Sequence, residues 1–253
     1  MNLSIITPSF NQGPYIERTI QSVLSQNGNF QTEYIIIDGG STDNTIDVLR
    51  KYETNLKWIS EPDSGQSDAI NKGFAMASGD ILAWLNSDDI YLPDALQHVT
   101  SEYTKNPFMW CFGNCIVINE NDTEIRRIIT QYKKQQSRRY SYRRLIRRDF
   151  ISQPATFFTR DAYKETGPID INLTYSMDYD YWLRLGRKSP PRYIDIDLSA
   201  FRWYQQSKNG AQYRKAAWET YLTARKHAAR NMRYDIILHY LHYHILKLLY
   251  RFI

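Results

Sequence analysis

The stretch Ile81-Leu82-Ala83-Trp84-Leu85-Asn86-Ser87-Asp88-Asp89 runs from five apolar residues directly into four oxygen-bearing side chains. A continuous apolar run is typical of a strand that is buried on both faces of a parallel sheet. Closely spaced oxygen ligands at the end of such a strand suit a hard cation such as Mg²⁺ or Mn²⁺, which fills its shell with ligand phosphates. The stretch therefore predicts a buried strand that ends at a cation site.

Apolar strands and helices alternate along the chain before this stretch. The predicted strands are Leu3–Ile6, Tyr34–Ile37 and Leu56–Ile59. The predicted helices begin after Pro14, cover Asp43–Tyr52, and run from a Ser67 cap through Ala77. Strands joined by helices of this length predict an α/β fold with a parallel sheet, and such sheets bind ligands beyond the carboxyl ends of their strands.

Acidic residues recur just after the predicted strands, at Asp38, Glu61, Asp63, Asp88 and Asp89. The topology would bring them to one edge of the sheet, where mutual repulsion is costly unless a cation or a donor-rich ligand lies among them. The alternative is that each one caps a helix or a turn. The alternative is easier to accept for one acid than for the whole set.

The second part of the chain is less regular. The predicted elements are strands at Met109–Ile118, Ala155–Thr159, Arg192–Ile196 and Ser199–Trp203, and a helix at Tyr179–Leu185 that Gly186 would end. From about Ala211 the pattern is helical, with an apolar stripe at Leu238, Leu241, Ile245, Leu248 and Phe252. The stripe would pack on the body of the protein, on a second copy of the chain, or on a membrane surface.

Positive charge is concentrated in residues 126–148, which contain ten Arg or Lys and no Asp or Glu, although the whole chain of 253 residues carries a net charge of only +5. Such a patch suits an anionic lipid surface or a phosphorylated acceptor, or forms only a solvated basic surface. Tyrosines interleave with the arginines, but no RNA- or DNA-binding motif accompanies them, so we expect no nucleic-acid partner.

The two cysteines, Cys111 and Cys115, lie too far apart along one predicted strand for an easy disulfide, and we interpret them as reduced. No segment has 18 uncharged apolar residues in a row, and the first ten residues do not resemble a signal peptide. We expect a cytoplasmic protein, peripheral on the inner face of the cell membrane.

Five segments together resemble glycosyltransferase family 2, the large inverting family with the GT-A fold. They are SIITPSFNQGPYIERTIQSVLSQ (4–26), YIIIDGGSTDNTIDVL (34–49), SEPDSGQSDAINKGFAMASGDILAWLNSDD (60–89), QPATFFTRDAYKETGPID (153–170) and SMDYDYWLRLG (176–186). The resemblance covers roughly residues 3–205. It implies a Rossmann-like, mixed but mainly parallel central sheet flanked by helices, with a donor half at 1–108, an acceptor half at 109–205 and a C-terminal helical extension at 206–253.

The resemblance implies a site for a nucleotide-sugar donor, with UDP favoured on family grounds and dTDP or GDP as the alternatives. Pro8 and Phe10 would lie against the nucleobase, and Asp38 would accept a hydrogen bond from it. The other residues placed around the donor are Asp63, Gln66, Asp68, Asn86, Ser87 and Arg202. An ordinary salt bridge is the alternative for Arg202.

Asn86-Ser87-Asp88 occupies the position of the Asp-x-Asp motif of the family. Asp88 would bind Mn²⁺ or Mg²⁺, whereas Asn86 replaces the first Asp and offers a carbonyl oxygen without a charge. The departure weakens the expected metal affinity.

On the acceptor side, Asp178 matches the acidic pair that supplies the catalytic base of the family, but Met177 stands where the first acid would be. Asp180 is a rival base, and helix capping is the alternative role for Asp178. Gln153 and Trp182 would lie near the acceptor by the same resemblance.

The sequence therefore favours an inverting glycosyltransferase that acts on a glycan or a lipid-linked acceptor in cell-surface polysaccharide synthesis, as a monomer or a homo-oligomer. A catalytically impaired relative that binds nucleotide sugars or glycans is the alternative, because acids are missing at Asn86 and Met177. A nucleotidyltransferase is disfavoured, because Ser9–Pro14 lacks the basic residues that would hold a triphosphate.

Overall fold

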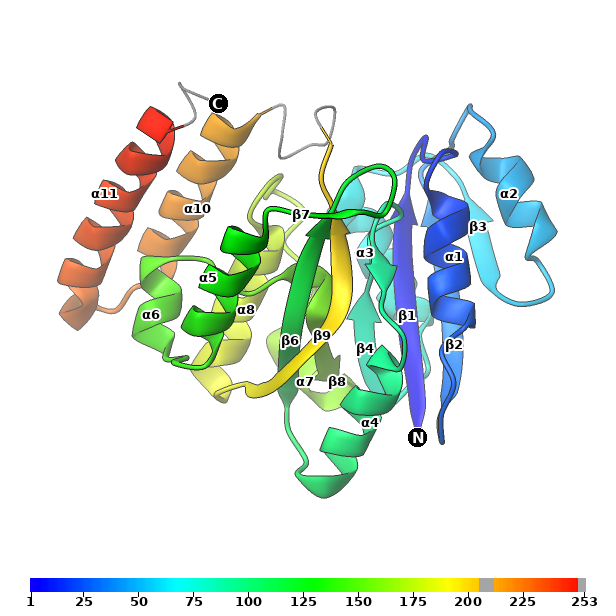
Figure 1. The fold of residues 1–253 in the computed structure, drawn as a ribbon, viewed down its shortest axis with the longest axis horizontal. Coiled ribbons are helices and arrows are strands. Elements are labelled where there is room, and N and C mark those ends of the chain that lie inside the picture. The colour runs from blue at the N-terminus through cyan, green and yellow to red at the C-terminus, as the bar shows by residue number, and fades with distance from the viewer. Residues whose placement is uncertain (205–211, 250–253) are drawn as a thin grey trace.

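The computed structural model describes residues 1–204 and 212–249, without the side chains of 246–249. One mixed sheet runs through it in the order β3-β2-β1-β4-β8-β6-β9-β5, with β7 paired to β6 (Figure 1). Helices cover both faces of the sheet, and two further helices lie at the end far from β3 (Figure 1). The prediction of a mixed, mainly parallel α/β sheet with a C-terminal helical extension is confirmed.

The first four strands are parallel, and they are β1 (Asn2–Ser9), β2 (Gln31–Asp38), β3 (Lys57–Ser60) and β4 (Ile81–Trp84). The connecting helices are α1 (Ile16–Leu24), α2 (Thr45–Lys51) and α3 (Gln66–Met76). Alternate residues of β4 enter opposite cores, with Leu82 and Trp84 in one and Ile81 and Ala83 in the other. Burial on both faces explains why the sequence of β4 is apolar throughout.

The second half of the sheet is mixed. It contains β5 (Ile90–Tyr91), β6 (Trp110–Ile118), β7 (Glu124–Ile125), β8 (Thr156–Thr159) and β9 (Arg192–Arg202). Strand β8 is antiparallel to both β4 and β6, whereas β9 runs parallel to β6. The two short strands predicted between 192 and 203 form the single strand β9, whose register with β6 shifts between Phe112 and Cys115.

The remaining helices are α4 (Ala95–Lys105), α5 (Arg127–Ser137), α6 (Tyr142–Arg147), α7 (Arg160–Thr166), α8 (Met177–Lys188), α10 (Tyr213–His227) and α11 (Arg233–Leu249), with short 3₁₀ turns at Gln153–Ala155 and Arg230–Met232. Helix α8 continues through Gly186, contrary to the prediction. A Cβ atom there would lie 2.8 Å from the Tyr140 hydroxyl, so the glycine serves close packing and does not end the helix. Ser67 does not cap α3, because its hydroxyl contacts the Met177 sulfur.

Trp182 lies at the centre of the core that α8 shares with the sheet. Its ring stacks on Trp84 with centroids 5.3 Å apart and on Trp110 with centroids 6.0 Å apart, and the residue is fully buried. The resemblance placed Trp182 near the acceptor; the structure places it in the core, where it fixes α8 on the sheet and does not line the cavity. In the part of the chain that the structure describes, no helix combines the length and apolar character needed to cross a bilayer.

Candidate active site

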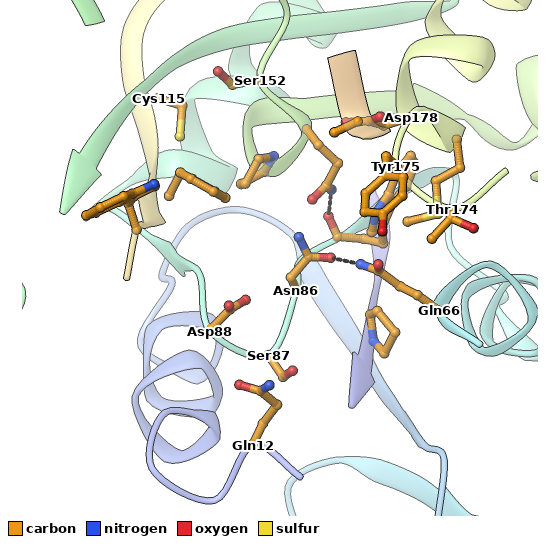
Figure 2. A pocket seen from close by; sticks show the side chains of 18 of the residues that line it. Gln12, Gln66, Asn86, Ser87, Asp88, Cys115, Ser152, Thr174, Tyr175 and Asp178 are labelled. Atoms are coloured by element: carbon orange, nitrogen blue, oxygen red, sulfur yellow. Dashed lines mark hydrogen bonds between the residues drawn. The ribbon is translucent and has the colours of Figure 1, made fainter. Parts of the chain in front are cut away.

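A cavity of about 1020 Å³ opens beyond the carboxyl ends of β1 and β4 (Figure 2). Pro8 and Phe10 border it from the end of β1, and Asp63 and Gln66 border it from the segment before α3. Asn86, Ser87 and Asp88 follow β4 directly into the same cavity. The sheet edge predicted from the apolar runs is therefore where the structure has its large cavity.

Of the four residues after Leu85, some face the cavity and others are buried within the turn. Asp88 faces the cavity (Figure 2), whereas Asp89 is fully buried and accepts a hydrogen bond of 2.9 Å from the Arg202 backbone amide. Asn86 links the two environments, because it accepts from Gln66 Nε2 at 2.7 Å and donates to Asp89 Oδ2 at 3.1 Å. One acid thus builds the turn, and its neighbour is presented to a ligand.

Arg202 supports this turn from behind. Its side chain is fully buried, and Nε donates to the Asp88 carbonyl at 2.8 Å while Nη1 donates to the Asn119 carbonyl at 2.8 Å and pairs with Asp122. Arg202 is absent from the cavity wall. Arg202, which the resemblance placed around the donor with a salt bridge as the alternative, is a buried residue that supports the turn carrying Asp88 and pairs with Asp122.

The surroundings of Asp88 favour a cation. Burial raises the pKa of its carboxyl, while the Tyr204 hydroxyl, which donates to Oδ2 at 3.0 Å, partly offsets that rise. A divalent cation would remove the cost of the charge in the same way. Within residues 1–204 and 212–249 no three His, Cys, Asp or Glu side chains converge on one point. The residues therefore fit an ion that completes its shell with ligand phosphate oxygens, as Mg²⁺ and Mn²⁺ do.

Two acids predicted to meet the donor, Asp38 and Asp68, do not line the cavity. Asp38 is fully buried and accepts hydrogen bonds from the Gly40 and Ser41 amides and from the hydroxyls of Ser41 and Ser60. Asp68 accepts from the Ser64 amide at 3.0 Å. Both side chains shape loops that surround the cavity, and contact of either with a donor stays a prediction.

On the far side of the cavity from Asp88, Asp178 enters from the first turn of α8, beside Tyr175 and Thr174 (Figure 2). Gln153 also lines the cavity, and its Nε2 atom donates to the Trp84 carbonyl at 2.6 Å. The cavity thus reaches from the turn after β4 to α8.

Asp180 points the other way, into the core. It is 1% exposed, and it contacts His227 Nε2 at 2.7 Å and Arg184 Nε at 2.8 Å. Burial would raise the pKa of Asp180, but these two partners lower it to about 2. The residue is therefore an ion-pair anchor for α8 and α10, and not a second carboxylate facing the acceptor side.

Asp149 is a cavity residue that the sequence did not reveal. It lines the cavity with Asp178, and its Oδ1 atom is buried without a hydrogen-bond partner among the described residues. Burial, together with the charge of Asp178, raises the pKa of Asp149 to about 7. No motif marks it, because it sits between α6 and the turn at Gln153 and reaches Asp178 only through the fold.

The family sequence model described as "Glycosyl transferase family 2" matches residues 4–167, which is more than half of the chain. The chain belongs to glycosyl transferase family 2. This family 2 protein is 31% identical over 205 residues to an uncharacterized glycosyltransferase of Mycobacterium tuberculosis, covering 79% of this chain and 74% of that one. It is 29% identical over 230 residues to a putative teichuronic acid biosynthesis glycosyltransferase, TuaG, of Bacillus subtilis, covering 88% and 87%.

Other relatives of this glycosyltransferase are longer. It is 33% identical over 138 residues to an uncharacterized glycosyltransferase of Nostoc sp., and that match spans 53% of this chain and 42% of the relative. A match of 29% identity to the chondroitin synthase of Escherichia coli spans 76% of this chain and 28% of the synthase.

Solved structures share the fold at low identity. TarS of S. aureus in complex with UDP-GlcNAc superposes with a TM-score of 0.69 at 16% identity, over 88% of this chain and 66% of TarS. A mannosyltransferase of Pyrobaculum calidifontis in complex with GDP-Man and Mn²⁺ gives 0.68 at 16% identity, over 94% and 68%.

The substitution Asp149→Asn should make stability less dependent on pH. Since the folded state holds the Asp149 proton more tightly than the unfolded chain, the wild type keeps this contribution below about pH 4 and loses it as the pH rises to about 7. Between these limits we expect the variant to gain up to roughly 4 kcal/mol of unfolding free energy relative to the wild type. Urea unfolding at several pH values measures the difference, with Asp161→Asn as an exposed control. An unchanged pH profile would contradict the assignment.

The substitution Asn86→Asp tests the cation site without any activity assay. It replaces the amide that donates to Asp89 with a third carboxylate beside Asp88 and Asp89, so we expect a loss of about 1–3 kcal/mol of unfolding free energy. Millimolar Mn²⁺ should restore the melting temperature, because a bound cation offsets the repulsion. Asn86→Ala loses the same hydrogen bond without adding charge and serves as the control. Equal gains from Mn²⁺ in both variants would argue against a cation at this turn.

Proposed function

We propose that this glycosyltransferase moves a sugar from a UDP-sugar to an acceptor hydroxyl with inversion of configuration, and that Mn²⁺ or Mg²⁺ assists. The observation that carries the proposal is a single cavity with Asp88 on one side and Asp178 on the other (Figure 2). An inverting transfer needs this arrangement, because the diphosphate leaves from one face of the sugar while the acceptor attacks from the opposite face.

The donor half would bind a nucleoside diphosphate. Pro8 and Phe10 offer apolar contacts for a base, and Phe10 is 59% exposed, which leaves its ring free to stack. The complexes of TarS with UDP and UDP-GlcNAc support a UDP-sugar, whereas the mannosyltransferase complex with GDP-Man keeps a guanine nucleotide as the alternative.

Asp88 would hold the cation, with Tyr204 fixing the orientation of its carboxylate. When bound, the cation would offset the negative charge that develops on the departing diphosphate. The Mn²⁺ in the mannosyltransferase complex supports this choice of metal. Asn86 would keep Gln66 and Asp89 in place, and a direct bond to the metal is not required of it.

Asp178 would act as the general base. Its carboxylate would take the proton of the acceptor hydroxyl as the hydroxyl oxygen attacks the anomeric carbon. Asp149 would assist, because two carboxyls facing one cavity compete for a proton and the pair retains it over a wider pH range than one carboxyl alone. Asp149, in the loop after α6, would thus supply the second carboxyl that is missing because position 177 is Met.

The acceptor would be a growing glycan or a lipid-linked sugar of a cell-surface polysaccharide. The teichuronic acid and chondroitin relatives support this class. Cys111 and Cys115 are free and buried, which fits a cytoplasmic enzyme. The second candidate, a non-catalytic relative that binds nucleotide sugars, is favoured only by the neutral residues Asn86 and Met177.

Paired substitutions separate the two candidates. Asp178→Asn should lower kcat by about 10²–10⁴-fold and leave the donor affinity unchanged, because it removes only the base. Asp88→Ala should remove the increase in melting temperature that UDP gives with Mn²⁺. Asp161→Asn, whose side chain is 85% exposed, is the matched control.

The measurements are initial rates with radiolabelled UDP-sugars and melting curves with and without UDP and Mn²⁺. Full transfer rates in both Asp178→Asn and Asp88→Ala would refute the site assignment. A product that retains the anomeric configuration of the donor would refute inversion. Donor binding without turnover by the wild type would favour the binding protein.

A further inference from the structure

The hairpin of α10 and α11 lies along one side of the molecule, and both helices pack on α6 or α8 (Figure 1). Its inner side combines apolar and polar contacts, because Ala224 and Ile236 pack in or against the core while charged side chains pair beside them. Asp235 of α11 is fully buried and pairs with Arg143 and Arg147 of α6, and His239 Nδ1 lies 2.7 Å from the Ile146 carbonyl. His227 of α10 contacts Asp180. Ion pairs and hydrogen bonds therefore anchor the hairpin to the body.

The outer side of the hairpin also exposes apolar side chains, where a surface helix usually exposes polar ones. The exposed side chains are Trp218 (42%) and Leu222 (42%) on α10, and Tyr234 (65%), Ile237 (55%), Leu241 (51%) and Ile245 (51%) on α11. Their spacing places each set on one face of its helix, opposite the anchored side. Apolar side chains gathered in this way mark a surface that binds something.

The charges around this apolar face are positive. Lys215, Arg225, Arg230 and Arg233 are exposed, and none forms an ion pair with a described residue. Residues 212–245 contain two acids, and both turn inward: Asp235 pairs with α6, while Glu219 accepts hydrogen bonds from the Tyr175 and Ser176 amides. The outer face of the hairpin is thus apolar and cationic together.

The basic run 126–148 is less available than its sequence suggests. Arg143 and Arg147 hold Asp235, and Lys134 and Arg138 pair with Asp197 and Asp195 of β9. Arg126 lies over the Trp203 ring at 3.6 Å. Part of this run therefore stabilises the fold. Helix α5 still exposes Ile128 (86%) beside Arg127 (76%), but the hairpin carries more exposed apolar side chains next to exposed cations.

We propose that the outer face of α10 and α11 binds an anionic lipid bilayer, and that it brings the cavity to a lipid-linked acceptor. Exposed Trp, Tyr and Leu beside Arg and Lys are the side chains that enter the interface of such a bilayer. A second copy of the chain would instead set equal positive charges against each other across an isologous contact. The identity of the acceptor rests on the proposed function, whereas the lipid surface does not.

Helix α10 connects the two surfaces. Ala216, Ala217 and Thr220 line the cavity, while Trp218 and Leu222 of the same helix face outward. A bilayer against the outer face would therefore lie one helix away from the site where an acceptor hydroxyl must arrive. This geometry suits an acceptor whose lipid stays in the membrane while its sugar enters the cavity.

Flotation of the full chain with vesicles tests the surface. We expect binding to vesicles of phosphatidylcholine with phosphatidylglycerol, at least ten-fold weaker binding to phosphatidylcholine alone, and strong weakening in high salt. The triple variant Trp218→Gln, Ile237→Gln, Leu241→Gln should lose at least ten-fold in partitioning. Arg225→Gln with Arg233→Gln should lose the preference for anionic lipid. Ile171→Gln, a 57% exposed apolar residue elsewhere, is the control.

The variants alter exposed side chains, and melting curves check that they fold. Equal partitioning of the wild type onto neutral and anionic vesicles would overturn the proposal, as would unchanged partitioning of the triple variant. A wild-type dimer that the triple variant converts to a monomer would overturn it in favour of a second copy. Ile128→Gln changes an 86% exposed residue of α5 and should leave vesicle binding intact. A loss of vesicle binding in this variant would place the lipid surface on the basic run and overturn the proposal.

Donor hydrolysis, measured on the same samples, keeps the two proposals apart. Docking variants that hydrolyse UDP-sugar at the wild-type rate but fail to float would support a separate lipid surface. A wild type that floats with anionic vesicles but never turns over a UDP-sugar would refute the proposed function and leave the lipid surface standing.

Discussion

The buried guanidinium of Arg202 is the constraint on which the geometry of the site depends. Within a fully buried environment it donates to the carbonyls of Asp88 and Asn119 and pairs with Asp122, while its own backbone amide donates to Asp89. Nε and Nη1 carry all of these side-chain contacts, because Nη2 is buried without a hydrogen-bond partner among the described residues. Separating the partners would leave the buried charge still less compensated, at a large cost. Arg202 thereby ties the end of β9 to the turn after β4 and to the loop after β6, and it fixes where Asp88 enters the cavity.

The same constraint explains why the residue before Ser87 is neutral. Asp89 is fully buried, and burial together with the nearby charge of Asp88 raises its pKa well above the ordinary range. An acid at position 86 would add a third carboxylate to this turn, whereas Asn86 donates a hydrogen bond to Asp89 instead. The departure from Asp-x-Asp is therefore compatible with an intact site, because the amide relieves a charge that the fold has placed there.

The hydrophobic patterns of short segments predicted the first half of the fold correctly. The apolar runs of β1, β2 and β4 and the helical spacing between them define parallel units, and the acids after the strands do gather near one edge. The residue assignments that were wrong or missed depend on contacts with residues that are distant in the sequence. Asp180 resembles a site residue in the sequence, but in the fold it contacts His227. Trp182 likewise stacks on Trp110 in the core. Asp149 resembles an ordinary loop residue, and only the fold brings it near Asp178. Gly186 resembles a helix stop because its close neighbour Tyr140 is not visible in the periodicity.

The hairpin of α10 and α11 gives part of the basic run 126–148 a structural role, because Arg143 and Arg147 pair with Asp235. Helix α11 packs Ile236 against the core, but it also turns Asp235 and His239 inward. These two side chains need Arg143, Arg147 and the Ile146 carbonyl to satisfy them. Burying Asp235 alone would be prohibitive, so the arginines of α6 make the inward polar face possible. The apolar side chains are then free to face outward. The sequence left a lipid surface, a phosphorylated acceptor and a solvated surface open for the basic run 126–148. Arg143 and Arg147 of that run instead hold in place the hairpin whose outer face we propose as the lipid-binding surface.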